Sequence, residues 1–164
     1  MHDDSLIATK LGQLLIGRQW TITTAESCTG GGIASVITSV AGSSSWFEQG
    51  FVTYSNSAKQ QQLGIDETLL IEHGAVSEAV VRAMCMGAGR KASAEVAIAV
   101  SGVAGPGGGS VDKPVGTVWL AWAIKGTGII ATCYQFKGGR DAIRAQAVTT
   151  AISELNKALS KSTV

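Results

Sequence analysis

The sequence predicts an α/β fold, a three-layer α/β/α sandwich around a mixed, mostly parallel sheet. The chain contains segments in which apolar residues recur at helical spacing and also short runs of β-type residues. The runs 96–101 and 117–124 are apolar on both faces, which is typical of strands that helices cover from both sides. The length of 164 residues is that of one domain, so we expect a single domain over 1–164.

The first half of the chain is predicted to begin with an amphipathic helix over 3–18. Leucine and isoleucine recur there at near-helical spacing behind an Asp/Ser start. Alternating β-type and helical segments follow. In order, these segments are a strand at 20–25, a helix at 30–40, a strand at 49–54 and short helices at 56–63 and 66–72.

The second half of the chain begins with Ser77, which can cap a helix over 78–92. The apolar run 96–101 ends in glycines and predicts a buried strand. The remaining segments are a hairpin formed by 117–124 and 129–136 around the turn 125–128, and a closing helix at 141–159.

The composition argues against several classes of protein. Lys and Arg number 13 against 12 Asp and Glu, and no basic run is long enough to bind a nucleic-acid backbone. The longest apolar stretches are too short to span a bilayer, and the acidic N-terminus lacks the basic and apolar regions of a signal peptide. We therefore expect a cytoplasmic protein with no nucleic-acid partner and no membrane partner.

The usual reactive-site patterns are missing from the sequence. Cys28, Cys85 and Cys133 are odd in number and lack CxxC spacing, as expected for reduced thiols rather than for disulfides or a zinc site. The histidines are His2 and His73, which makes a Ser-His-Asp triad difficult to assemble. There is also no GxSxG or GxxxxGK[ST] motif. We expect no metal and no cofactor, and a serine nucleophile would need a base other than histidine.

Two glycine-rich turns are candidates for a ligand site. In α/β folds, ligands gather where strands end and glycine-rich turns lead into helices, because free backbone N–H groups face the crevice there. The segments 27–32 and 101–109 fit this description. Two plainer interpretations stay open, in which Ser27 or Thr29 merely caps a helix and the second segment is a flexible surface loop.

Lys59 is the candidate base. It lies in TYSNSAK, where Asn56 is a plausible N-cap that would place Lys59 in the first turn of a helix. The positive end of the helix dipole and partial burial both disfavour an ammonium group and lower its pKa, and a neutral lysine can accept a serine proton. A solvated surface lysine, with Tyr54 as a half-buried aromatic at a strand end, explains the same residues.

Four motifs together resemble the C-terminal domain family of the competence/damage-inducible protein CinA. They are TAESCTGGG, GSSSWFEQGFVTYSNSAKQQQLGI, HGAVSE, and SGVAGPGGG followed by KPVGTVW. The resemblance runs in order from about residue 6 to 155. The resemblance implies that the protein is an amidohydrolase acting on a linear amide. The implied reaction is hydrolysis of nicotinamide mononucleotide to nicotinate mononucleotide and ammonia, a step of pyridine-nucleotide salvage that uses no metal.

The resemblance also implies roles for individual residues. Ser27 matches the nucleophile of the family, and Lys59 and Tyr54 match its partners. Lys59 would accept the serine proton, and Tyr54 would orient the lysine or relay the proton to the leaving ammonia. Together with the glycine-rich turns, this predicts an oxyanion site at the backbone of Thr29, Gly30 and Gly31, and a ribose and phosphate site at Ser101, Gly102, Gly105 and Arg140. Family members commonly carry aspartate directly before this arginine, whereas this chain has Gly139.

Two alternatives to a serine amidase stay open. The first is a domain that binds a nucleotide without turning it over, as a sensor or an assembly module, in which case Ser27 and Lys59 are incidental. In a thiol amidase, Cys28 would be the nucleophile. The residues do not decide whether the protein is a homo-oligomer, in which a second subunit would complete the glycine-rich crevice.

Overall fold

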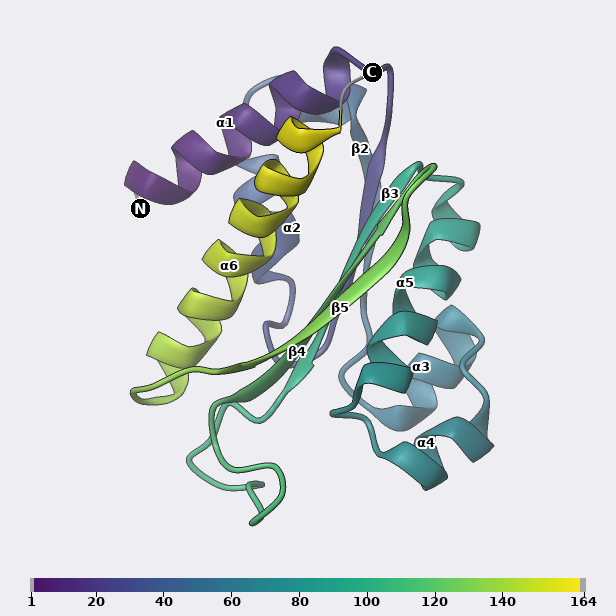
Figure 1. Ribbon diagram of the computed structural model, residues 1–164, viewed down its shortest axis with the longest axis vertical. Coiled ribbons are helices and arrows are strands. Elements are labelled where there is room, and N and C mark those ends of the chain that lie inside the picture. The colour runs from purple at the N-terminus through teal and green to yellow at the C-terminus, as the bar shows by residue number, and fades with distance from the viewer. Residues whose placement is uncertain (1, 163–164) are drawn as a thin grey trace.

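One five-stranded sheet forms the centre of the computed structural model, which describes residues 2–162 (Figure 1). The strands are β1 (Ile22–Glu26), β2 (Phe47–Val52), β3 (Val96–Gly102), β4 (Thr117–Ile124) and β5 (Gly128–Gln135). The helices are α1 (His2–Ile16), α2 (Gly32–Thr38), the 3-10 turn η1 (Ser43–Ser45), α3 (Asn56–Leu63), α4 (Glu67–His73), α5 (Glu78–Ala92) and α6 (Arg140–Lys161).

The strand order is β2-β1-β3-β4-β5. β1 pairs in parallel with both β2 and β3, whereas the β3–β4 and β4–β5 pairs are antiparallel. β4 therefore runs against the other strands of this sheet, which share one direction. The predicted mixed, mostly parallel sheet is confirmed.

Helices cover both faces of the sheet, as predicted. α1, α2 and α6 lie on one face, and α3, α4 and α5 lie on the other (Figure 1). The first face holds a core that includes Leu11, Ile37 and Ile152, while Leu63 and Met84 belong to the core under α5. No helix within residues 2–162 has the length and apolar character needed to cross a membrane.

Several element boundaries differ from the sequence prediction, and the backbone explains two of them. The helix predicted at 30–40 begins at Gly32, because Gly30 and Gly31 adopt φ values of 59° and 98° that an α-helix does not allow. The first helix ends at Ile16 rather than at residue 18, since the chain turns and Gln19 reaches φ 56°. The segment 56–63 forms α3 as predicted.

The sheet register brings three strand ends together. Glu26, the last residue of β1, pairs with Val52 of β2 and with Val100 of β3. The turn after β1, the connection from β2 to α3 and the glycine-rich loop after β3 therefore all lie at the carboxyl edge of the parallel strands. This edge is where open α/β sheets bind ligands.

Candidate active site

Ser27 and Lys59 are in contact at this edge of the sheet. The Nζ atom of Lys59 lies 3.1 Å from the Oγ atom of Ser27 and donates a second hydrogen bond to the carbonyl oxygen of Thr53 at 2.8 Å. Lys59 is 1% exposed and Ser27 is 9% exposed. The structure thus places a buried amine against a serine hydroxyl, although the two residues are 32 positions apart in the chain.

The start of α3 directs Lys59 inward. Ser55 is the N-cap, and its hydroxyl accepts the amide hydrogen of Ala58 at 3.0 Å. The prediction that Asn56 caps this helix is therefore wrong by one residue, and Lys59 lies one turn into α3. The amide of Thr53 donates to the carbonyl of Glu26 at 2.8 Å, which fixes the carbonyl that holds the lysine.

Burial lowers the pKa of Lys59 below its ordinary value of 10.5, and a smaller opposing effect comes from Cys28. Burial acts in this direction because a buried ammonium group loses its hydration. The sequence predicted a lowered pKa from the helix N-terminus and from partial burial, and burial is the main cause in the structure. A larger fraction of Lys59 is therefore neutral, and a neutral amine is able to accept the proton of Ser27.

Glu26 organises the turn that carries Ser27, a role that the sequence did not reveal. Its fully buried carboxylate accepts the hydroxyl of Thr29 at 2.6 Å and the amides of Ile33 and Ala34 at 2.8 and 3.0 Å. These amides belong to the first turn of α2, whose N-cap Gly31 supplies no side chain. Glu26 therefore replaces the missing cap, and its negative charge faces the positive end of the helix.

We expect Glu26→Ala to lower the free energy of unfolding by about 2 to 4 kcal/mol, because buried amides of α2 would lose a charged acceptor. Urea denaturation at pH 7 measures this loss. Glu78→Ala is the matched control, because Glu78 forms an exposed ion pair with Arg82 and its removal costs about 1 kcal/mol or less. Equal stability of the two variants would contradict the capping role of Glu26.

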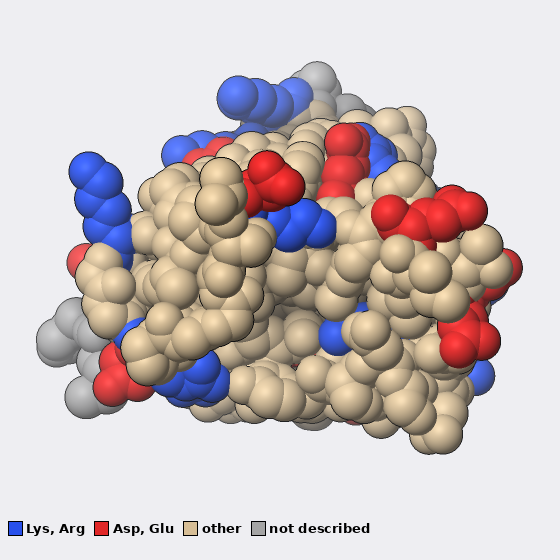
Figure 2. Space-filling model, turned by 90° about the horizontal axis from the view of Figure 1, so that it is seen from below, with Lys and Arg blue, Asp and Glu red and all other residues tan. Residues whose placement is uncertain are grey.

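A pocket of about 340 Å³ opens beside the Ser27–Lys59 pair. The loop after β3 forms part of its lining, and Ala75 and Val76, just before α5, also contribute to it. Of the residues predicted to bind ribose and phosphate, the lining includes Ser101, Gly102, Gly105 and Arg140. Figure 2 shows this end of the molecule, where most of the surface is uncharged and side chains of both charge signs are scattered.

The loop after β3 is an ordered wall of this pocket because its glycines allow close packing. A Cβ atom on Gly105 would lie 2.5 Å from Val115, and φ of Gly105 is +78°. A Cβ atom on Gly102 would lie 2.7 Å from the side chain of Val118. Both glycines are therefore required by packing, whatever the pocket binds.

Arg140 and Tyr54 meet at the rim of the pocket. Arg140 begins α6 behind Gly139, which is the N-cap and makes no side-chain capping bond. The guanidinium group donates to the carbonyl of Gly105 and to the hydroxyl of Tyr54, both at 2.8 Å. The structure pairs Tyr54 with Arg140 rather than with Lys59, and the carbonyl of Thr53 takes the lysine-orienting role that the sequence suggested for Tyr54.

Thr29, Gly30 and Gly31 are not among the residues that line the pocket. The hydroxyl of Thr29 donates to Glu26, and the amide of Gly30 donates to the carbonyl of Ser27 at 3.0 Å. Thr29 and Gly30 therefore help to build the turn, and the contact of the amides of Thr29, Gly30 and Gly31 with substrate stays a prediction. Cys28 does line the pocket, and within residues 2–162 its amide forms no hydrogen bond to a backbone carbonyl.

The thiol of Cys28 is poorly suited to act as a nucleophile. Its side chain is largely buried, and this burial raises the pKa of Cys28 to about 11. A thiol with such a pKa is almost fully protonated at neutral pH, while the thiolate is the reactive form.

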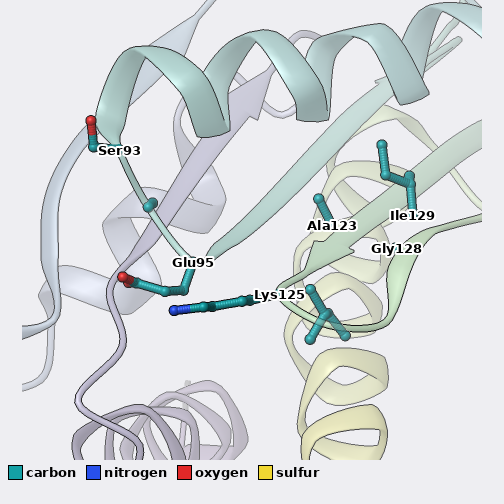
Figure 3. A pocket seen from close by; sticks show the side chains of 8 residues that line it. Ser93, Glu95, Ala123, Lys125, Gly128 and Ile129 are labelled. Carbon is teal, nitrogen blue, oxygen red and sulfur yellow. The ribbon is translucent and has the colours of Figure 1, made fainter.

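A second cavity, of about 380 Å³, lies at the opposite end of the sheet. Ser93, Glu95, Lys125 and Ile129 are among its lining residues, and Figure 3 shows the side chains of Glu95 and Lys125 extending in the same region between the strand ends. Glu95 accepts hydrogen bonds from the amide and hydroxyl of Thr21 at 2.7 and 3.1 Å. Its carboxylate therefore has a structural partner.

The fold and the site together define the class of protein. It is an α/β/α sandwich with a buried Ser–Lys pair at the carboxyl edge of its sheet, beside a glycine-rich loop. The chain belongs to the family described as the CinA C-terminal domain, whose model matches residues 4–159. The predicted family resemblance is thereby confirmed.

Named relatives match over nearly the whole chain. A nicotinamide-nucleotide amidohydrolase PncC from Escherichia coli (strain K12) is 54% identical over 159 residues, which cover 94% of this chain and 95% of that protein. The protein of the same name from Pseudomonas putida is 55% identical over 155 residues, covering 94% of this chain and 96% of the relative.

Solved structures support the same relationship. The crystal structure of competence damage-inducible protein A (ComA) from Klebsiella pneumoniae superposes with a TM-score of 0.93 at 38% identity, covering 98% of this chain and 99% of that one. The competence/damage inducible protein CihA from Agrobacterium tumefaciens gives a TM-score of 0.92 at 40% identity, covering 97% and 96%. The fold prediction is confirmed by these neighbours.

Proposed function

We propose that this protein is a nicotinamide-nucleotide amidase. It hydrolyses the carboxamide of nicotinamide mononucleotide, giving nicotinate mononucleotide and ammonia. The names of its full-length relatives support this substrate. The observation that carries the chemistry is the contact between the buried Nζ atom of Lys59 and the Oγ atom of Ser27 at 3.1 Å.

In this mechanism Ser27 is the nucleophile and Lys59 the general base. Neutral Lys59 keeps one N–H directed at the carbonyl of Thr53 and turns its lone pair toward Ser27. It accepts the hydroxyl proton as Oγ attacks the amide carbon, and it returns this proton to the leaving nitrogen, so that ammonia departs. Water then attacks the acyl-enzyme, with Lys59 again accepting a proton, and the acid is released.

The oxyanion that forms on the amide oxygen needs a hydrogen-bond donor. We assign this role to the amide of Cys28, because Cys28 follows the nucleophile directly and lines the pocket, and its amide forms no hydrogen bond to a backbone carbonyl within residues 2–162. In other serine hydrolases the amide of the residue after the nucleophile serves the same purpose.

The nucleotide part of the substrate is assigned to the loop side of the pocket. Ser101, Gly102 and Gly105 line this side, and Arg140 stands at the rim with its guanidinium group. A guanidinium group suits a phosphate because it offers charge and several N–H donors. In the structure it donates to Gly105 and Tyr54, so binding of the phosphate would replace or share these contacts.

The test is release of ammonia from nicotinamide mononucleotide by the purified protein, with Cys28→Ala measured in parallel. We expect turnover by the wild type and near-normal turnover by Cys28→Ala, because the proposed oxyanion donor is a backbone amide that alanine retains. If the protein binds the nucleotide and releases no ammonia, it is the non-catalytic sensor or assembly module that the sequence left open. Loss of activity in a folded Cys28→Ala variant would instead favour the thiol mechanism.

A further inference from the structure

Arg144 binds two backbone carbonyl groups of the turn that carries Ser27. It lies on α6, and its Nε and Nη2 atoms donate to the carbonyl oxygens of Cys28 and Thr29, each at 3.2 Å. Its guanidinium group is partly buried, and Arg144 is not among the residues that line the pocket. It therefore touches the turn that carries Ser27 without a position from which to touch substrate.

A chain of hydrogen bonds leads from Arg144 back to the proposed oxyanion donor. The carbonyl of Thr29, which accepts from Arg144 and also from the amide of Gly32 at 3.1 Å, shares its peptide unit with the amide of Gly30. That amide donates to the carbonyl of Ser27 at 3.0 Å. The carbonyl of Ser27 shares its peptide unit with the amide of Cys28.

Charge at one end of such a chain strengthens the donor at the other end. Each peptide unit that accepts a hydrogen bond at its oxygen becomes a better donor at its nitrogen, and a low local dielectric increases this polarisation. The cation of Arg144 therefore acts through two peptide units on the amide of Cys28. The two contacts of Arg144 on successive carbonyls also fix the orientation of the turn, and with it the Oγ atom of Ser27.

We propose that Arg144 is a positioning residue of this enzyme, which holds and polarises the Ser27 turn so that the amide of Cys28 faces the developing oxyanion. This inference rests on the proposed function for its substrate, though its geometry does not depend on the substrate. Arg144 differs in this from Arg140, which lines the pocket and which we assign to the phosphate.

The experiment compares wild type with Arg144→Gln, Arg144→Lys and the control Arg82→Gln. Arg82 lies on α5, donates to the carbonyl of Ile129 at 2.7 Å and does not line the pocket. Arg82→Gln therefore shows the effect of removing an arginine that binds a backbone carbonyl away from the active site. Two kinds of rate are measured. One is the release of ammonia, from nicotinamide mononucleotide and from nicotinamide riboside, and the other is covalent labelling of Ser27 by a fluorophosphonate. Thermal melting checks that each variant is folded.

For Arg144→Gln we expect kcat to fall on the order of 100-fold with KM little changed, because a small misplacement of a nucleophile or a weakened oxyanion donor has an effect of this size. The mononucleotide and the riboside lose the same factor, and fluorophosphonate labelling slows in parallel. Arg144→Lys loses less, because its ammonium keeps the charge but reaches one carbonyl at a time. Arg82→Gln keeps both rates.

Three results would overturn the inference. The first is an unchanged kcat and labelling rate in Arg144→Gln. The second is a loss of kcat confined to the mononucleotide, which would make Arg144 a phosphate ligand. The third is a wild type that the fluorophosphonate does not label. If Arg144→Gln fails to fold, Arg144→Lys decides by the same readings. A wild type that is labelled but releases no ammonia refutes the proposed substrate alone, and the labelling rates of the variants still decide the role of Arg144.

Discussion

Ser27→Ala is expected to reduce ammonia release from nicotinamide mononucleotide by more than about 1000-fold, since loss of a serine nucleophile removes the acyl-enzyme route. The fold should remain intact. The Oγ atom of Ser27 takes no part in capping α2, because Glu26 caps that helix. The Oγ atom instead accepts a hydrogen bond from Lys59. Steady-state ammonia assays and thermal melting measure the two expectations separately.

Ser57→Ala is the matched control for this variant. Ser57 is exposed in the first turn of α3 and does not line the pocket, so Ser57→Ala removes a serine hydroxyl close to Lys59 in the chain without affecting the pocket. Near-normal turnover by Ser27→Ala would end the covalent mechanism. Rapid acid quench of the wild type adds a direct check, because an acyl-enzyme that accumulates shifts the mass of the peptide that contains Ser27.

The sequence predicted the parts of this site that depend on local patterns. Ser77 caps a helix over 78–92 as expected, because an N-cap and its helix are adjacent in the chain. The glycine-rich loop lies beside Ser27 as expected, since parallel strands bring their carboxyl ends to one edge. The pairing of Ser27 with Lys59 came from the family resemblance, because no local rule links two segments so far apart.

The parts that sequence reasoning missed depend on tertiary contacts. Glu26 reads as an ordinary residue at a strand end, and its capping role appears only when the turn brings α2 back over it. Arg144 lies more than one hundred residues from the carbonyls it binds. The carbonyl of Thr53 carries no sequence signal at all, because every residue has a carbonyl group.

The rate of the wild-type enzyme should rise with pH through the pKa of Lys59. The active form is the neutral amine, and burial lowers the pKa of Lys59, so the rising limb of kcat/KM should lie at lower pH than for an ordinary lysine. The lowered pKa of Lys59 also determines whether its contribution to stability rises or falls with pH. Between the folded and the unfolded pKa the unfolded chain binds more protons at this position, so the contribution of Lys59 to stability increases with pH across that window.

Lys59→Arg should fail nearly as badly as Lys59→Ala, with kcat reduced far more than KM is raised. Arginine keeps the positive charge, but a guanidinium stays protonated at any workable pH and cannot accept the proton of Ser27. Arginine is also larger than lysine and Lys59 is buried, so melting curves must show that the variant is folded, and Lys59→Ala provides the comparison without added bulk.

Lys125→Arg, at the opposite end of the sheet, is the control that should retain full activity. If a folded Lys59→Arg variant keeps most of the rate and the rising limb of the pH profile, Lys59 acts as a fixed cation rather than as the base, and the proton of Ser27 must leave by another group, with Tyr54 the next to test.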